Sequence, residues 1–312
     1  MQSALPRDSV PADLREGLVN FARFASTEIS TMDESLLPEL AQALPVGMSL
    51  YVAHTPKATL QDVIRTASKA QSLGFAACPH IVARRLASRS SLDDALQTLR
   101  HNGVHQALFV SGDLDVPLGP YSNTLEVIDS GLLDSSGLTG ISFAGHPEGH
   151  RHAEEQVLLA ALRHKQAFAV RTGIAVRVVT QFGFNPDLIR QWADSLRANS
   201  ITLPISVGIA GPTPLSKLIR FAMQCGVGAS IGSIKNSLGA MANLARMAKG
   251  PDEMMLGLVT RRSAYPSTSI VAPHIYAFGG SLATARWLRA VIEGRIELAS
   301  NGAKFAVRTT WE

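Results

Sequence analysis

The sequence predicts an α/β protein built as one closed (β/α)8 barrel, also called a TIM barrel. Eight short apolar segments alternate with amphipathic segments along the 312 residues. Alternation of strand and helix requires parallel pairing with right-handed crossovers. Eight such units in a chain of about 300 residues are typical of a closed barrel. An open doubly wound sheet would need a glycine-rich turn after the first strand, where the sequence reads Glu28-Ile29-Ser30-Thr31.

The expected strands are short runs in which apolar residues predominate, many of them β-branched or aromatic. They cover residues 21–29, 46–54, 75–83, 104–113, 138–146, 176–184, 204–211 and 273–280. The expected helices are amphipathic and cover residues 33–44, 59–73, 91–102, 122–133, 152–171, 187–198, 215–225, 233–248, 252–261 and 281–293. Thr59 with Asp62, and Ser91 with Asp94, predict capping boxes at two helix starts.

Three parts of the chain are expected. Residues 1–20 are polar with two prolines and are expected to form an irregular arm with a short helix, residues 21–300 the single barrel, and residues 301–312 a short tail. The N-terminal residues lack the apolar core of a signal peptide, and no apolar run reaches the roughly 18 residues of a membrane-spanning helix. We therefore expect a soluble, cytoplasmic protein with no membrane partner.

Composition and charge indicate which classes of partner to expect. The chain is 46% hydrophobic and 17% charged, with a formal net charge of +4. Its only adjacent arginines are Arg84-Arg85 and Arg261-Arg262, and no basic stripe with interleaved aromatic residues is present, so nucleic acid is not an expected partner. A mildly basic surface suits an anionic small molecule. Cys78 and Cys225 lie in apolar surroundings and are expected to be buried free thiols.

Polar side chains gather where the expected strands end. They are Glu28, His54, His80, Ser111-Gly112-Asp113, His146 with His150, Gln181 and Tyr276. In a barrel of this type the active site lies at the carboxyl ends of the strands. The pattern therefore predicts a functional mouth.

Two chemistries could use such a mouth. Histidines with Glu28 or Asp113 could bind a divalent metal ion, but the first strand ends in neither His-x-His nor a lysine that could bridge two metals. The favoured alternative is an organic cofactor or substrate held by hydrogen bonds, with no metal. Glycines at four strand ends, namely Gly112, Gly145, Gly183 and Gly211, would let flat rings approach the backbone.

Gln181 ends the apolar run Val178-Val179-Thr180 and precedes a Gly-Phe-Asn-Pro turn. An uncharged amide at the tip of a buried strand could hydrogen-bond a polar heterocycle. It could equally cap the strand. The residues by themselves leave both interpretations open.

Several motifs carry a family resemblance. They are Thr180-Gln181-Phe182, Pro79-His80-Ile81, Gly112-Asp113-Leu114, His146-Pro147-Glu148-Gly149-His150, Gly208-Ile209, Phe221-Ala222 and His274-Ile275-Tyr276. In their order and strand positions they resemble the methylenetetrahydrofolate reductase family, in its short bacterial form that is only the catalytic barrel. The resemblance spans roughly residues 20 to 290.

The resemblance implies that FAD binds in the barrel mouth. A hydride would pass from NAD(P)H through the flavin to 5,10-methylenetetrahydrofolate, giving 5-methyltetrahydrofolate, or the reverse. It leaves open NADH against NADPH, the direction in the cell and the oligomeric state, a homo-oligomer included.

Individual roles also follow from the resemblance. Glu28 matches the general acid that protonates the leaving nitrogen when the substrate ring opens. Asp113 matches the aspartate that contacts flavin and pterin, and is expected to be catalytic too. The expected substrate-binding residues are Gln181, which matches the amide that holds the folate, Phe221, which matches the ring stacked on the p-aminobenzoyl group, and Tyr276. From the residues alone, Glu28 could be a helix-start charge, Asp113 a turn residue and Phe221 a core residue.

The expected cofactor-binding residues are His80, Ser111, Gly112, Asp113, His146, His150 and Lys165. Two of them depart from the family pattern, since Ser111 replaces an arginine and His146 a tyrosine; near Tyr276, Phe278-Gly279-Gly280 replaces a Leu-Asn-Arg. These losses fall mainly on flavin contacts. Two alternatives therefore stay open, a folate-binding barrel with weak or no FAD binding, and a metal-dependent barrel lyase or hydrolase.

Overall fold

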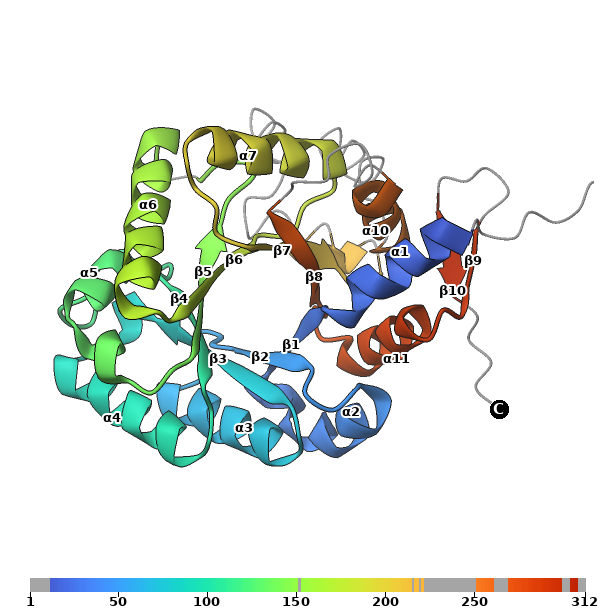
Figure 1. Ribbon diagram of the computed structural model, residues 1–312. Coiled ribbons are helices and arrows are strands. Elements are labelled where there is room, and N and C mark those ends of the chain that lie inside the picture. Colours follow the sequence, from blue (N-terminus) through green and yellow to red (C-terminus); the bar gives the residue numbers. More distant parts are fainter. Residues whose placement is uncertain are drawn as a thin grey trace, which may run out of the picture.

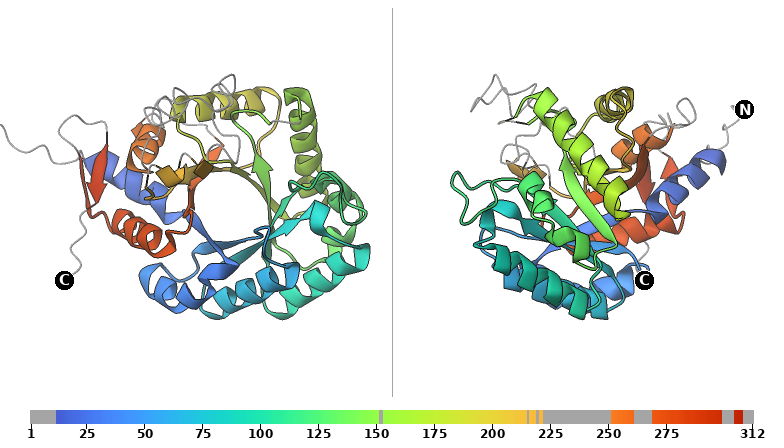
Figure 2. Two further views of the ribbon diagram at one scale, coloured as in Figure 1. Left: turned by 180° about the vertical axis from the view of Figure 1, so that it is seen from behind. Right: turned by 60° about the vertical axis from the view of Figure 1, so that its left-hand side comes forward.

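A closed barrel of parallel strands forms the centre of the protein. The computed structural model describes residues 12–150, 153–214, 216–218, 220–221, 251–260, 269–298 and 304–307. Eight strands pair in sequence order, β1 to β8, and β8 pairs with β1 to close the ring (Figure 1). Helices cover the outer face of this ring, as Figure 2 shows from behind and from the side. The expected fold class is confirmed.

The barrel strands are β1 Ser26–Ser30, β2 Ser49–Ala53, β3 Ala76–Val82, β4 Gln106–Val110, β5 Gly140–Gly145, β6 Ala175–Thr180, β7 Ile205–Ala210 and β8 Ile270–Tyr276. The α-helices are α1 Ala12–Arg23, α2 Leu37–Ala43, α3 Leu60–Ser72, α4 Arg89–His101, α5 Thr124–Asp129, α6 Glu155–Thr172, α7 Pro186–Ala198, α10 Pro251–Thr260 and α11 Ser281–Ile292. Short 3-10 helices are η1 Thr31–Leu36, η2 Ala83–Arg85 and η3 Leu132–Ser135.

The first strand begins later than expected. Residues 21–23 belong to α1, so the expected boundary at residue 20 falls inside this helix. Leu14, Leu18 and Phe21 recur at helical spacing and pack against the core, which decides the segment in favour of helix. Strand β1 then starts at Ser26.

One of the two expected capping boxes is confirmed. The Thr59 hydroxyl accepts from the backbone N–H of Asp62, whose carboxylate accepts from the Thr59 N–H. The box expected at Ser91 and Asp94 was wrong. Helix α4 starts earlier, because the Ser88 hydroxyl accepts from Ser91 N at 3.0 Å and the Ser91 hydroxyl accepts from Ser88 N.

Some expectations lie outside the described residues. These are the helix at 233–248, most of the one at 215–225, Cys225 and Arg261-Arg262. At the C-terminal end, β9 Ile296–Leu298 and β10 Phe305–Val307 form a separate antiparallel pair. Phe305, in the expected tail, is buried against Trp287 of α11. The division into arm, barrel and tail stays a prediction.

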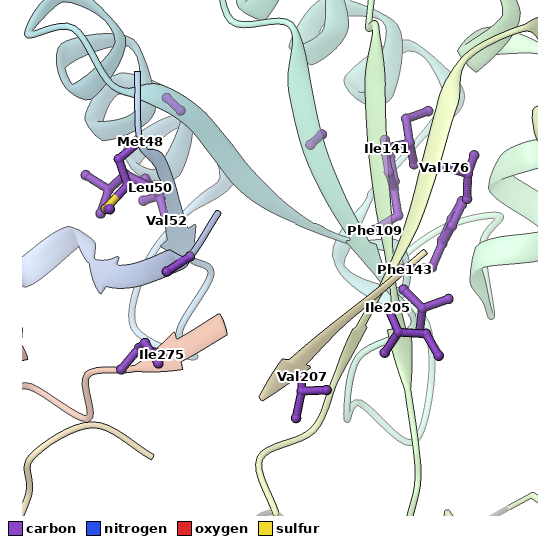
Figure 3. Close-up of a cluster of buried hydrophobic side chains, with 14 of the residues drawn as sticks. Met48, Leu50, Val52, Phe109, Ile141, Phe143, Val176, Ile205, Val207 and Ile275 are labelled. Atoms are coloured by element: carbon purple, nitrogen blue, oxygen red, sulfur yellow. The ribbon is translucent and has the colours of Figure 1, made fainter. Parts of the chain in front are cut away.

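Strand side chains alternate between two different cores. One face packs against the helices, and Figure 3 shows part of this apolar layer, including Leu50, Phe143 and Val207. The other face points into the barrel, where Tyr51, Cys78, Leu108 and Val179 pack together. Cys78 is a buried free thiol, as expected. In the described part of the chain, no helix is long and apolar enough to cross a membrane.

Gly208 of β7 has no free space for a side chain. A Cβ there would overlap the carbonyl oxygen of Thr180 and lie 2.7 Å from the Tyr276 ring. We expect Gly208→Ala to lower the free energy of unfolding by about 1–3 kcal/mol, measured by urea titration. Gly140→Ala is the control, because its Cβ would meet only the flexible Gln106 side chain at 3.4 Å. An equal effect of both substitutions would contradict the prediction.

Candidate functional site

Glu28 lies on the inner face of β1, in the middle of this five-residue strand. Its side chain is 15% exposed, and its Oε2 is 3.9 Å from Nε2 of the fully buried His274 on β8. The other ring nitrogen of His274, Nδ1, is 2.8 Å from the buried Ser26 hydroxyl. Nε2 itself has no hydrogen-bond partner within the described residues. Ser26 and His274 thus form a buried polar pair beneath the Glu28 carboxyl group.

The Ser26 hydroxyl can donate or accept, so it is compatible with either tautomer of His274. If Ser26 donates to Nδ1, Nε2 carries the proton and faces a Glu28 carboxylate. If Nδ1 donates to Ser26, Nε2 offers a lone pair and faces a protonated Glu28. The pair can therefore accompany either state of the acid. Because Ser26 is buried, this Ser-His-Glu row presents no nucleophile to a substrate.

Aromatic and imidazole rings surround His274. Tyr51 and Tyr276 each lie edge-on to it, with ring centroids 4.7 Å away. His80 of β3 lies 5.9 Å from Tyr51, and its buried Nε2 has no partner within the described residues. Burial, then His274 and His54, lowers the pKa of His80 to about 3. His80 is therefore neutral near pH 7.

Asp113 lies farther out, on the loop after β4. It is 77% exposed, and its Oδ1 is 3.4 Å from Nη2 of Arg85. Ser111 contributes a backbone carbonyl, which accepts from Arg84 N at 3.0 Å. Gly112 has φ +95°, which a residue with a side chain rarely adopts. These expected site residues lie together on one loop, but the described structure shows no contact between Asp113 and Glu28.

Gln181 acts as a strand cap in this structure. Its Oε1 accepts from the N–H of Phe182 at 3.1 Å, which supports the capping interpretation for that oxygen. Its Nε2 forms no hydrogen bond within the described residues, so the amide could still donate to a ligand. Tyr276 reaches the same strand end and donates its hydroxyl to the carbonyl of Thr180 at 3.0 Å.

Phe221 joins an aromatic stack. Its ring stacks on Phe278 at 4.6 Å between centroids, and Phe278 stacks on Tyr276 at 5.9 Å. Phe278 has φ +46°, an uncommon conformation for a bulky residue. Phe182 packs edge-on against the stack. This apolar wall flanks the mouth beside β6 to β8.

His146, His150 and Lys165 form a second group near the end of β5. The rings of His146 and His150 lie edge-on at 4.7 Å. Lys165 of α6 is 8% exposed, and its Nζ lies over the Phe143 ring, 4.8 Å from the centroid. Burial lowers the pKa of Lys165 to about 8, and burial, then His150 and Lys165, lowers that of His146 to about 4.

The sequence suggested that the four strand-end glycines leave space for flat rings to approach the backbone. In the structure, protein atoms already occupy the place where each Cβ would lie. A Cβ on Gly145 would lie 2.9 Å from Trp192, and one on Gly211 would lie 2.7 Å from the Thr284 hydroxyl. One on Gly183 would meet Ile189 and Glu148, and one on Gly112 would overlap Val82. Their missing side chains make room for neighbouring residues.

The histidines that the structure describes do not form a metal-ligand set around one point. Within the described ranges, no three His, Cys, Asp or Glu side chains converge in a way that could hold a metal ion. The described site thus gives the metal-dependent alternative no support. Hydrogen bonding to an organic ligand remains the favoured chemistry.

Three residues at the site had no expected role: Ser26, His274 and Arg85. Ser26 lies two residues before Glu28 on β1, and His274 lies two residues before Tyr276 on β8. Side chains two residues apart on a strand point to the same face, so this alternation could have identified both residues. Arg85 belonged to an arginine pair whose two side chains the sequence could not tell apart.

The low pKa of His80 predicts a pH effect. Below about pH 6.5, the unfolded chain binds a proton at this residue, whereas the folded chain does so only near pH 3. Stability is therefore complete above about pH 6.5 and falls as the pH drops, by up to about 1.4 kcal/mol per pH unit. We expect His80→Gln to flatten this slope between pH 6.5 and 4, in urea titrations at several pH values. The same slope in wild type, His80→Gln and the exposed control His101→Gln would contradict this.

Comparison with known proteins agrees with the motifs. A family model for methylenetetrahydrofolate reductase matches residues 30–238. A 5,10-methylenetetrahydrofolate reductase of Pectobacterium carotovorum subsp. carotovorum is 28% identical over 220 residues, which cover 68% of this chain and 70% of that protein.

Two solved structures show weaker likeness. A dihydropteroate synthase of Thermus thermophilus is 14% identical with a TM-score of 0.45, over 86% of this chain and 92% of that one. A putative phosphonomutase of Burkholderia cenocepacia is 11% identical with a TM-score of 0.48, over 90% of this chain and 99% of that one. The family model spans well over half of the sequence, and on that ground the chain belongs to the methylenetetrahydrofolate reductase family.

Proposed function

We propose that this protein is a cytoplasmic, flavin-dependent methylenetetrahydrofolate reductase. It would interconvert 5,10-methylenetetrahydrofolate and 5-methyltetrahydrofolate, with NAD(P)H as co-substrate. The observation that carries the proposal is the position of Glu28. In a chain of this family, a carboxyl group stands at the inner rim of the barrel above the buried Ser26–His274 pair.

The unpaired polar atoms at the mouth fit FAD. Nδ1 of His54, Nε2 of His80 and Nε of Arg85 are buried polar atoms without partners in the described structure. Nδ1 of His54 is an acceptor that suits a hydroxyl or a ring N–H, Nε2 of His80 suits a polar ring edge, and the Arg85 N–H suits a phosphate. His80, His146 and His150, with Ser111, Gly112, Asp113 and Lys165, are the residues proposed to hold it. When bound, FAD supplies hydride transfer between nicotinamide and folate.

Glu28 handles the proton of the reaction. Opening the five-membered ring of the substrate requires a proton on the leaving nitrogen, and the Glu28 carboxyl group delivers it. His274 faces Glu28 and is held in place by the Ser26 hydroxyl, which is compatible with either tautomer of the ring. The nearly complete burial of this pair keeps water from competing for the same hydrogen bonds.

The remaining residues orient the substrate. Asp113 binds the amino-pyrimidine edge of the pterin and stabilises the cation that ring opening creates. Nε2 of Gln181 donates to the same ring system. Phe221 leaves Phe278 to stack on the p-aminobenzoyl group, which exchanges one aromatic contact for another. Tyr276 keeps the tip of β6 in place through its bond to Thr180.

A second candidate is a folate-binding barrel with weak or no flavin binding. Lys165 favours it, because the burial that lowers its pKa to about 8 also keeps its amine from solvent and from phosphates. Ser111 adds no charge of its own. Titration of the apo-protein with FAD and with 5-methyltetrahydrofolate separates the candidates, since folate binding without flavin binding supports the second.

Glu28→Gln tests the proton donor. We expect folate reduction to fall by about 100-fold or more, because the amide cannot protonate the leaving nitrogen. Flavin reduction by NADH should change by less than about threefold, since that half-reaction does not use this proton. Stopped-flow measurement of the two half-reactions distinguishes them. Glu39→Gln, on the exposed side of α2, is the control. Wild-type rates in both half-reactions of Glu28→Gln would refute the assigned role.

The purified protein offers a direct test of the cofactor. We expect absorption bands near roughly 370 and 450 nm, as for oxidised flavins, either as isolated or after addition of FAD and gel filtration. Bleaching of the longer band by NADH or NADPH under anaerobic conditions should follow. A colourless protein that binds 5-methyltetrahydrofolate would favour the second candidate.

A further inference from the structure

The two adjacent arginines after β3 behave differently. Arg84 forms hydrogen bonds to backbone carbonyls within the protein. Its Nε donates to the carbonyl of Ser122 at 2.8 Å, and its Nη1 donates to that of Leu114 at 2.6 Å. Arg85 is mostly buried, with a side chain 14% exposed, yet it is incompletely paired. Its Nη1 donates to the carbonyl of Thr55 at 3.0 Å, and its buried Nε has no partner in the described structure.

The one ion pair that Arg85 forms within the described residues is weak. Asp113 is 77% exposed and its Oδ1 lies 3.4 Å from Nη2, so water competes for the carboxylate. A guanidinium has five N–H groups, and here few of them are used. Burying such a cation without full pairing costs free energy, which a tightly held anion would recover.

The surroundings of Arg85 favour an anionic ligand. The residue lies at the end of η2, between the loop after β2, where Thr55 accepts its hydrogen bond, and the loop after β4, which carries Asp113. Burial, then the charge of Arg85, lowers the pKa of the neighbouring His54. Nε2 of His54 donates to the carbonyl of Ala58 at 3.1 Å, which leaves Nδ1 as an unpaired acceptor for a ligand hydroxyl.

We propose that Arg85 binds a phosphate group of the ligand in the barrel mouth and exchanges Asp113 for it. The guanidinium turns from a carboxylate in solvent to a phosphate that accepts two N–H bonds at once. Asp113 is then released toward the substrate. The inference rests on the proposed function for the identity of the flavin, but the phosphate site itself is independent of it.

The exchange can be measured by anion binding. Isothermal titration with pyrophosphate and with FMN should show at least about tenfold weaker binding to Arg85→Ala than to wild type. Riboflavin, which has no phosphate, should bind both within about twofold. Arg85→Lys keeps the charge but loses the two-pronged geometry, so it should recover only part of the loss. Arg171→Ala, which removes an exposed partner of Asp134 at the end of α6, is the matched control.

A double-mutant cycle tests the exchange itself. Asp113→Asn should strengthen pyrophosphate binding by about two- to fivefold, because the competing carboxylate is gone. The gain should vanish in the Arg85→Ala background, whereas a general effect of charge would persist there.

Two results would overturn the inference: equal binding of pyrophosphate and FMN by wild type and Arg85→Ala, or wild type that does not bind FMN more tightly than riboflavin. Failure of the proposed function looks different. Pyrophosphate binding that depends on Arg85, in a protein that binds no FAD, would refute the cofactor and leave the phosphate site standing.

Discussion

The seam between β1 and β8 is the constraint on which the rest of this barrel depends. Only two residue pairs join these strands, Ser26 with His274 and Thr27 with Ile275. Side chains reinforce both, since the Thr27 hydroxyl donates to the Ile275 carbonyl at 2.9 Å and Ser26 pairs with the His274 ring. The contacts that close the ring therefore also support Glu28. Ser26 and His274 both close the barrel and lie beside the proposed proton donor, so a change in the contact between β1 and β8 would also alter the site.

The barrel interior combines apolar side chains with hydrogen-bonded polar groups. Tyr51 and Ser142 share a hydrogen bond of 2.8 Å across the barrel, and burial raises the pKa values of Tyr51 and Cys78 far above their usual range. Burial keeps His80 neutral as well. Charged groups such as Glu28 and Arg85 stand at the rim, where solvent or a ligand can reach them. A mouth of this kind suits a polar heterocycle whose charge changes only at one point of the reaction.

The proposed functional residues divide among four regions of the mouth. Glu28 and His80 lie on the barrel strands β1 and β3, and Arg85 and Asp113 on the loops after β3 and β4. Lys165 lies near the end of β5 with His146, and the side of β6 to β8 carries Gln181, Phe221 and Tyr276. On the proposal, the positive charge missing at Ser111 is supplied by Arg85 from a neighbouring strand end. The phosphate would then be bound by an arginine that lies near Ser111 in space but not next to it in the sequence.

The sequence by itself determined the barrel, the order of its strands and most of the candidate site. Hydrophobic alternation is a local signal, and in parallel strands the carboxyl ends must meet at one rim, so Glu28, Asp113, Gln181 and Tyr276 could be assigned to the mouth. Local signals failed where tertiary packing chose between two local options. The local sequence of residues 21–23 is compatible with either a strand or a helix. Burial of Leu18 and Phe21 against the core favours the helix.

Only the tertiary structure decided how individual side chains are partnered. It turned the oxygen of Gln181 onto the backbone of Phe182, filled the space beside the strand-end glycines with neighbours such as Trp192, and distinguished Arg84 from Arg85. It also joined Ser26 to His274, which lie 248 residues apart in the chain. The physical reason is that a hydrogen bond depends on distances of a few tenths of an ångström between atoms from different strands. A linear pattern specifies which face a residue occupies, but it does not contain those distances.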